Sequence, residues 1–122
     1  MIGSMMKAAI AFLIAAILAS PAMATPQLDP VFGNTLEMTY PDGRLARLWL
    51  DRDGSYRGVN WHGRTSSGRW FVKPGKVCMK QKRPLPMPIS FCTPLVAGSV
   101  GAAWGGRAVS GEPIRIRLVA GR

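Results

Sequence analysis

Side chains that carry catalysis or bind metals are scarce in this sequence. Its 122 residues include one histidine, two cysteines and six acidic residues. A zinc site made from Cys78, Cys92 and His62 would lack a fourth strong ligand. A nucleophilic site needs a base beside a nucleophile, but the segment that holds His62, Ser66 and Ser67 does not match the G-x-S-x-G elbow. We therefore expect a protein without enzymatic activity, bound metal or cofactor.

Long stretches free of glycine and proline are missing as well. The chain has 14 glycines and 10 prolines, and beyond its first 24 residues the longest interval without either is residues 44–53. An average α-helix takes about 11–12 residues, so the chain has little room for one. Short runs between turn signals instead predict β-strands. Within residues 45–50, a helical face of Leu45, Leu48 and Trp49 is a competing interpretation.

The expected strands are short and follow one another at hairpin spacing. In residues 34–40, Leu36, Met38 and Tyr40 share one face, and Pro41-Asp42-Gly43 then turns the chain. Strands are predicted at residues 34–40, 45–50, 55–61, 69–72, 77–80, 89–96 and 114–119, with a polar loop at 62–68 and a glycine-rich segment at 98–106. Seven or eight such strands predict an all-β antiparallel meander that closes into a small barrel, although a β-sandwich fits the same spacing.

The N-terminal region has the pattern of a cleavable secretory signal. The apolar run of residues 8–19 would span about 18 Å as a helix, which is too short for the ~30 Å core of a bilayer. Lys7 precedes this run, and Ala22-Met23-Ala24 follows it as a small-x-small cleavage site. We expect residues 1–24 to be a signal peptide that is cleaved before Thr25. Met1, Met5 and Met6 are alternative starts.

Export defines the compartment and the state of the cysteines. Residues 25–122 are expected to form a single domain, periplasmic or secreted, with no transmembrane span. Its first residues, 25–33, are rich in proline and are expected to lie on the surface. In an oxidising compartment Cys78 and Cys92 have one possible partner each, so a disulfide is predicted. Closing this 15-residue loop would stabilise the fold by about 3 kcal/mol.

The chain is strongly basic, with a formal net charge of +10. A charge of this size draws a protein to anionic surfaces. For an exported protein the accessible anions are lipid head groups, lipopolysaccharide and acidic polysaccharide, and no nucleic acid is expected. The densest cluster of basic residues is the candidate anionic-surface patch, and it comprises Lys73, Lys76, Lys80, Lys82 and Arg83. The alternative interpretation of this cluster is an ordinary solvated hairpin turn.

Four tryptophans supply much of the apolar area available to so small a domain. Trp49, Trp61, Trp70 and Trp104 are expected to fill the core of the barrel. One or two of them, if they lie near the mouth of the barrel, would line a pocket for a small molecule.

Several short motifs resemble those of a family of small exported proteins of alphaproteobacteria whose function is not known. The motifs are Gly33-Asn34-Thr35-Leu36, Asp53-Gly54-Ser55-Tyr56, Gly68-Arg69-Trp70, Cys78 and Cys92. More distantly, the chain is similar to lipocalin-like periplasmic inhibitor barrels. The resemblance implies a small lipocalin-like barrel and no particular activity.

The sequence therefore predicts a non-catalytic binding or envelope-associated protein, with anionic envelope material as a candidate ligand. The alternative is a periplasmic protease inhibitor of lipocalin-like type. Such an inhibitor would present an N-terminal segment, here Thr25–Pro30, to the protease. A lysozyme inhibitor is disfavoured, because a protein with this positive charge would be repelled by a basic lysozyme.

Overall fold

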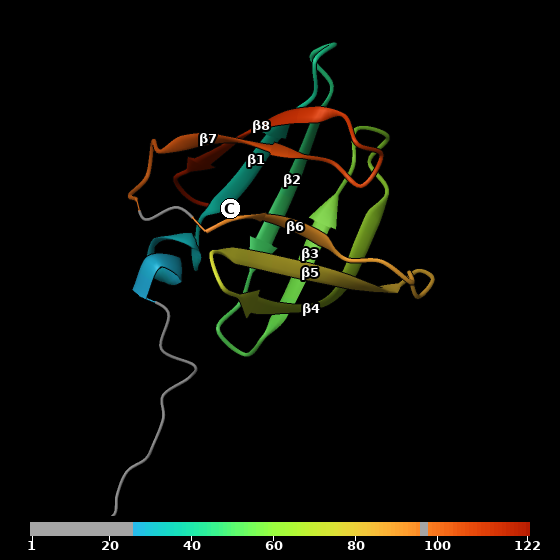
Figure 1. Ribbon diagram of the computed structural model, residues 1–122, viewed down its shortest axis with the longest axis horizontal. Coiled ribbons are helices and arrows are strands. Elements are labelled where there is room, and N and C mark those ends of the chain that lie inside the picture. The colour runs from blue at the N-terminus through green and yellow to red at the C-terminus, as the bar shows by residue number, and fades with distance from the viewer. Residues whose placement is uncertain (1–25, 96–97) are drawn as a thin grey trace, which may run out of the picture.

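The described part of the chain is an all-β domain. The computed structural model describes residues 26–95 and 98–122, in which one 3-10 turn precedes eight strands (Figure 1). The elements are η1 (Pro26–Val31), β1 (Thr35–Thr39), β2 (Leu45–Leu50), β3 (Ser55–Val59), β4 (Thr65–Lys73), β5 (Lys76–Arg83), β6 (Phe91–Pro94), β7 (Ala103–Arg107) and β8 (Pro113–Val119). The predicted signal peptide lies outside the described residues. Within those ranges no helix is long and apolar enough to cross a membrane.

All paired strands are antiparallel, and the sheet curls into a nearly closed barrel. The strand order is β6-β5-β4-β3-β2-β1-β8-β7, so every pairing but one joins strands that are consecutive in the sequence. The exception is β1 with β8, which brings the first and last strands side by side. The predicted meander closing into a barrel is thereby confirmed. A sandwich would need two sheets, whereas all eight strands belong to one.

Four of the hairpins use the same turn. In each, a glycine at the fourth position has φ between +77° and +92° and donates its N–H to the carbonyl of the first residue at 2.8–3.1 Å. Glycine adopts this conformation without a steric penalty. The turns are Tyr40–Gly43, Asp51–Gly54, Asn60–Gly63 and Ala108–Gly111. Because consecutive strands alternate in direction, the first, third and fourth of these turns lie at one end of the barrel.

The segment with two interpretations, residues 45–50, is strand β2. Ala46, Leu48 and Leu50 are buried, whereas Arg47 between them is exposed. This alternation has the period of two that a strand imposes. The helical face that the spacing also allowed is not formed, because the turns on either side direct β2 between β1 and β3.

The predicted loop at residues 62–68 is shorter in the structure. The side-chain oxygen of Asn60 accepts the backbone N–H groups of His62 and Arg64, both at 2.9 Å. The turn is therefore complete at Arg64, and β4 begins at Thr65. The polar residues that follow belong to the strand and pair with β3.

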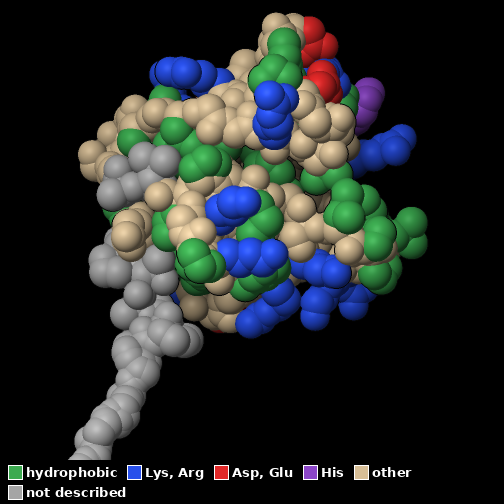
Figure 2. Space-filling model, in the orientation of Figure 1, with side chains coloured by type: hydrophobic (Ala, Val, Ile, Leu, Met, Phe, Trp, Pro, Cys, Tyr) green, Lys and Arg blue, Asp and Glu red, His purple; other side chains and the backbone are tan. Residues whose placement is uncertain are grey.

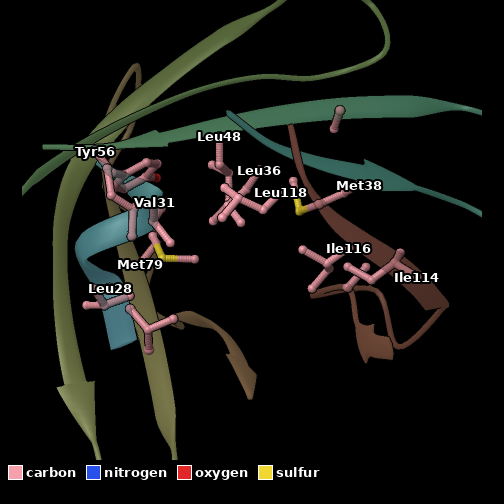
Figure 3. Close-up of a cluster of buried hydrophobic side chains, with 14 residues drawn as sticks. Leu28, Val31, Leu36, Met38, Leu48, Tyr56, Met79, Ile114, Ile116 and Leu118 are labelled. Atoms are coloured by element: carbon pink, nitrogen blue, oxygen red, sulfur yellow. The ribbon is translucent and has the colours of Figure 1, made fainter. Parts of the chain in front are cut away.

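One end of the barrel is closed by η1. Its Leu28 and Val31 are buried, at 2% and 6% exposure, and Figure 3 shows them beside Tyr56 and Met79. The expectation that residues 25–33 lie on the surface was wrong for this part. The prolines that suggested an exposed segment set up a tight 3-10 turn, and its apolar side chains cover the end of the core.

The edge strands of the sheet, β6 and β7, meet at a seam where the barrel closes. The predicted disulfide between Cys78 and Cys92 is confirmed, and it joins directly opposed residues of β5 and β6. Across the seam, the indole N–H of Trp104 on β7 donates to the hydroxyl of Thr93 on β6 at 3.0 Å. Thr93 is only 1% exposed, so this hydrogen bond satisfies a polar group within the core.

Candidate functional site

A pocket of about 480 Å³ opens at the end of the barrel opposite η1. We call this end the mouth and the cavity the mouth pocket. Five inward-facing side chains, from β1, β2, β3, β5 and β6, form its apolar interior: Met38, Leu48, Tyr56, Met79 and Phe91. Side chains alternate between the two faces of a strand, and on β1, β2 and β3 the neighbouring positions carry the charged residues Glu37, Arg47 and Arg57, which point outward. The volume lies in the range of small-molecule sites, about 300–1,000 Å³.

The rim of the mouth pocket is built around Arg44. The guanidinium carbon of Arg44 lies 4.7 Å from the ring centroid of Tyr40 and 4.4 Å from that of Trp61. Arg44 also forms ion pairs with Asp42 at 2.6 Å and with Glu112 at 2.7 Å. These residues come from the three turns at this end and from the positions next to them. Arg44 thus links three hairpins, and its charge is already neutralised by two carboxylates.

The environment of the rim shifts the pKa of several groups. The hydrogen bond from the Arg44 side chain holds the pKa of Asp42 below its ordinary value. Burial raises the pKa of Tyr40, and the nearby carboxylate of Glu112 raises it further. Burial also raises the pKa of Tyr56. Both phenols therefore remain neutral hydrogen-bonding groups at physiological pH.

We expect the two tyrosines to ionise at a higher pH in the folded protein than in the unfolded one. The chain has only two tyrosines and both line the mouth pocket, so the ultraviolet absorbance of phenolate reports on this site alone. A raised pKa means that the folded state holds its protons longer. The stability that this contributes is complete below about pH 10 and is lost as the pH rises through the raised values.

The measurement is a spectrophotometric titration of the native protein and of the same protein in denaturant. Tyr40→Phe leaves Tyr56 as the only phenol, which separates the two contributions. Superimposable native and denatured curves would contradict the burial of these rings.

The four tryptophans have three different environments. Trp61 lies at the rim of the mouth pocket and is 39% exposed. Trp70 and Trp104 pack against the core, where their indole N–H groups donate to the Asp51 carbonyl and to Thr93. Trp49 lies on the outer surface of the barrel. One of the four thus lines the mouth pocket, and two serve the core as expected.

The five residues of the predicted basic patch are spread along a strand. Lys76, Lys80, Lys82 and Arg83 all belong to β5, and Lys73 lies across the hairpin from Lys76. All five are exposed. Lys73 and Lys76 flank the tip of the β4–β5 hairpin, and the other three residues follow along the length of β5. Sequence clustering overstated how compact the patch is, because an extended strand separates its residues by about 3.3 Å each.

Two further arginines on neighbouring strands extend this basic surface. Arg69 on β4 lies directly opposite Lys80, and Arg57 on β3 pairs with Ser67, which in turn pairs with Arg83. The sequence analysis missed both, because they are distant from the cluster along the chain. The pairing of residues across the β3–β4 and β4–β5 hairpins is the signal that places both arginines beside the cluster. We call the whole surface the outer basic face: Arg57, Arg69, Lys73, Lys76, Lys80, Lys82 and Arg83.

Five of the six acidic residues form ion pairs with arginines outside the outer basic face. The sixth, Asp53, lies beside Arg69, whose guanidinium donates to the Asp53 backbone carbonyl at 3.0 Å and is close enough to interact with its carboxylate. The five ion pairs of the described residues are Asp42–Arg44, Glu112–Arg44, Glu37–Arg47, Asp29–Arg52 and Asp51–Arg122. Within the described part of the chain, no member of the outer basic face takes part in one. In Figure 2 blue side chains gather over the lower part of the molecule, near β4 and β5, and other blue side chains lie at the top beside the red ones.

The outer basic face includes a shallow groove of about 470 Å³. It runs beside Trp49, Arg57, Ser67 and Arg83. The guanidinium of Arg57 lies 5.4 Å from the centroid of the Trp49 ring, so this arginine is held in place without an acidic partner. The groove offers two cations, hydroxyl groups and an aromatic surface.

In the ranges 26–95 and 98–122, no three His, Cys, Asp or Glu side chains come together to hold a metal ion. The segment that the resemblance to inhibitors would present to a protease contains Leu28, which is buried in the closed end.

Comparison of the chain with protein-family models, curated proteins and solved structures found no match.

Proposed function

We propose that this is an exported, non-catalytic protein that binds anionic envelope material through the outer basic face. The observation that supports the proposal most strongly is the concentration of basic side chains on this one face. Seven basic side chains lie on three adjacent strands, and none takes part in an ion pair among the described residues. The shared ligand chemistry is a surface or polymer that repeats phosphate or carboxylate groups, as in lipid head groups, lipopolysaccharide or acidic polysaccharide.

Strand geometry suits such a ligand. Neighbouring strands are about 4.8 Å apart, so Arg69 and Lys80 present adjacent cations in a row across the sheet. Like charges directly opposite each other destabilise a sheet. A bound polyanion would relieve the repulsion between these two cations. The relief would contribute favourably to the free energy of binding. The bulge between β4 and β5 at Ser67 and Gly68 further curves this surface.

The strength of binding is expected to come from the sum of weak contacts. Each basic residue near an anionic surface contributes about 1 kcal/mol, and the attraction fades within a screening length of about 8 Å at physiological salt. Binding should therefore decline steeply as salt is added. A protein that recognised a single site by shape would be less sensitive to salt.

The test is a triple charge reversal, Lys80→Glu with Lys82→Glu and Arg83→Glu. We expect it to weaken binding to vesicles containing phosphatidylglycerol at low salt by at least ~100-fold, from three lost contacts of ~1 kcal/mol each. Vesicles of phosphatidylcholine alone should bind neither protein. Because all three side chains are exposed, the melting temperature should change little.

The matched control reverses Arg64, Arg107 and Arg115, which lie outside the outer basic face and are also exposed. It has the same net charge as the first triple variant. If both variants lose binding equally, only net charge matters and the proposal of a specific face is wrong. Lipopolysaccharide and acidic polysaccharide, tested with the same pair of variants, distinguish the sources of the anion.

A further inference from the structure

The mouth pocket has a second, independent binding chemistry. Its interior is apolar, and it includes two methionines, Met38 and Met79, whose flexible side chains adapt to ligands of different shape. Below the polar rim, β4 and β5 contribute the polar side chains of Ser66 and Gln81. A cavity that is mostly apolar and has a few convergent polar groups is the usual form of a small-molecule site.

Charge at the rim decides what the ligand cannot be. Arg44 is held at 2.6 Å by Asp42 and at 2.7 Å by Glu112, so it has no unsatisfied charge to offer an anion. An anionic group would also meet those two carboxylates. The position over the rings of Tyr40 and Trp61, where a cationic group would bind, is already occupied by the guanidinium of Arg44. An uncharged ligand needs neither a free cation nor a free ring face at the rim.

The volume sets the size of the ligand. About 480 Å³ lies within the range of about 300–1,000 Å³ that small-molecule sites occupy. A small molecule with an aromatic or aliphatic body would bury its apolar surface against the apolar walls. Burial of apolar surface contributes about 25 cal/mol per Å², which is the driving force for its entry.

We infer that the mouth pocket binds an uncharged, mainly apolar small molecule that carries one hydrogen-bonding group. The apolar body lies against Met38, Leu48 and Met79, and the polar group meets Ser66 or Gln81 on the β4–β5 side. The protonated phenol of Tyr56 provides another neutral partner within the pocket. This site is separate from the outer basic face, so one protein carries two binding surfaces of opposite character.

Two matched probes test the inference. N-phenyl-1-naphthylamine is uncharged, and 1-anilinonaphthalene-8-sulfonate has the same ring skeleton with one added sulfonate. We expect the neutral probe to bind saturably, with one site for each protein molecule, and at least about tenfold more tightly than the anionic probe. Fluorescence enhancement of the probe measures both, on the full domain in the presence of enough salt to screen the outer basic face.

Variants then locate the site. Ser66→Phe places a large side chain on the inner side of β4 and should weaken the neutral probe at least about tenfold. Val109→Trp, at an exposed position on the rim, should weaken it too without touching the core. Val100→Trp is the control, because Val100 is equally exposed but does not line the pocket. The Lys80, Lys82 and Arg83 reversal should leave the neutral probe within about twofold.

The outcomes separate clearly. No saturable binding of the neutral probe overturns the inference. Tighter binding of the anionic probe that disappears in the triple reversal also overturns it, and at the same time supports the outer basic face as the site. Equal effects of Val109→Trp and Val100→Trp would show that the probe binds somewhere other than the mouth.

Discussion

Replacing both Cys78 and Cys92 with alanine is expected to lower the free energy of unfolding by about 2–4 kcal/mol. The bridge closes a short loop, with a sequence separation of 14, and ties β6 to β5. β6 has only four residues and lies at the edge of the sheet. Without the bridge, only its four-residue pairing with β5 and the Thr93–Trp104 hydrogen bond would hold the strand at the seam. Chemical unfolding in oxidising buffer measures the difference.

Two controls keep this result interpretable. Reduction of the native protein should reproduce the loss seen in the double variant. Hydrogen exchange should show that amides of β6 lose protection first, because this strand depends most on the bridge. A double variant that is as stable as the oxidised protein would mean that the disulfide contributes nothing to the fold.

The second large effect is expected from Gly68→Ala. This glycine lies at the bulge between β4 and β5, and a Cβ atom there would collide with the carbonyl oxygen of Lys80 and lie 3.0 Å from the backbone nitrogen of Lys82. Backbone atoms cannot move aside as a flexible side chain can. Overpacking of this kind costs about 1–3 kcal/mol or more, and here the longest hairpin would have to shift.

Gly105→Ala is the matched control for that substitution. Gly105 also lies within a strand, β7, but a Cβ atom added there meets nothing within 4 Å. The stability of this variant should stay close to that of the native protein or rise by about 0.4–1 kcal/mol, because alanine restricts the unfolded chain. Thermal melts of the two variants give the comparison. A Gly68→Ala protein that melts with the native one would show that the bulge is not tightly packed.

Local sequence patterns were enough to predict the architecture. The alternation of Leu36 and Met38 and the glycines of the turns specified strands and hairpins, since both signals act within a few residues. Residues 45–50 were ambiguous because leucine spacing fits both a helix and a strand, and the flanking turns decided between them. The disulfide was predicted from the presence of only two cysteines and from the expectation of export, and the structure contains it.

The candidate sites could not be read in the same way. The rim of the mouth pocket depends on Arg44 and Glu112, which are 68 positions apart and meet only once the barrel closes. Leu28 and Val31 were expected on the surface with the rest of residues 25–33. The neighbouring sequence contains no signal that these side chains cover the end of a barrel. The outer basic face needed the register of β4 against β5, which a bulge shifts by one residue.

Closure of the barrel has a consequence for the order of folding. A chain that crosses a membrane in the N-to-C direction would deliver β1 long before β8, although these strands pair. The hydroxyl of Thr35 donates a hydrogen bond to the carbonyl of Gly121, which lies 86 positions later in the sequence. Hairpins from β1 to β5 can form as they emerge, because their contacts are local, whereas the final pairing must close a loop of almost the whole domain. Until then one side of β1 is an unpaired edge, open to other chains. The last strand to arrive therefore ends the period in which this protein is most prone to aggregate.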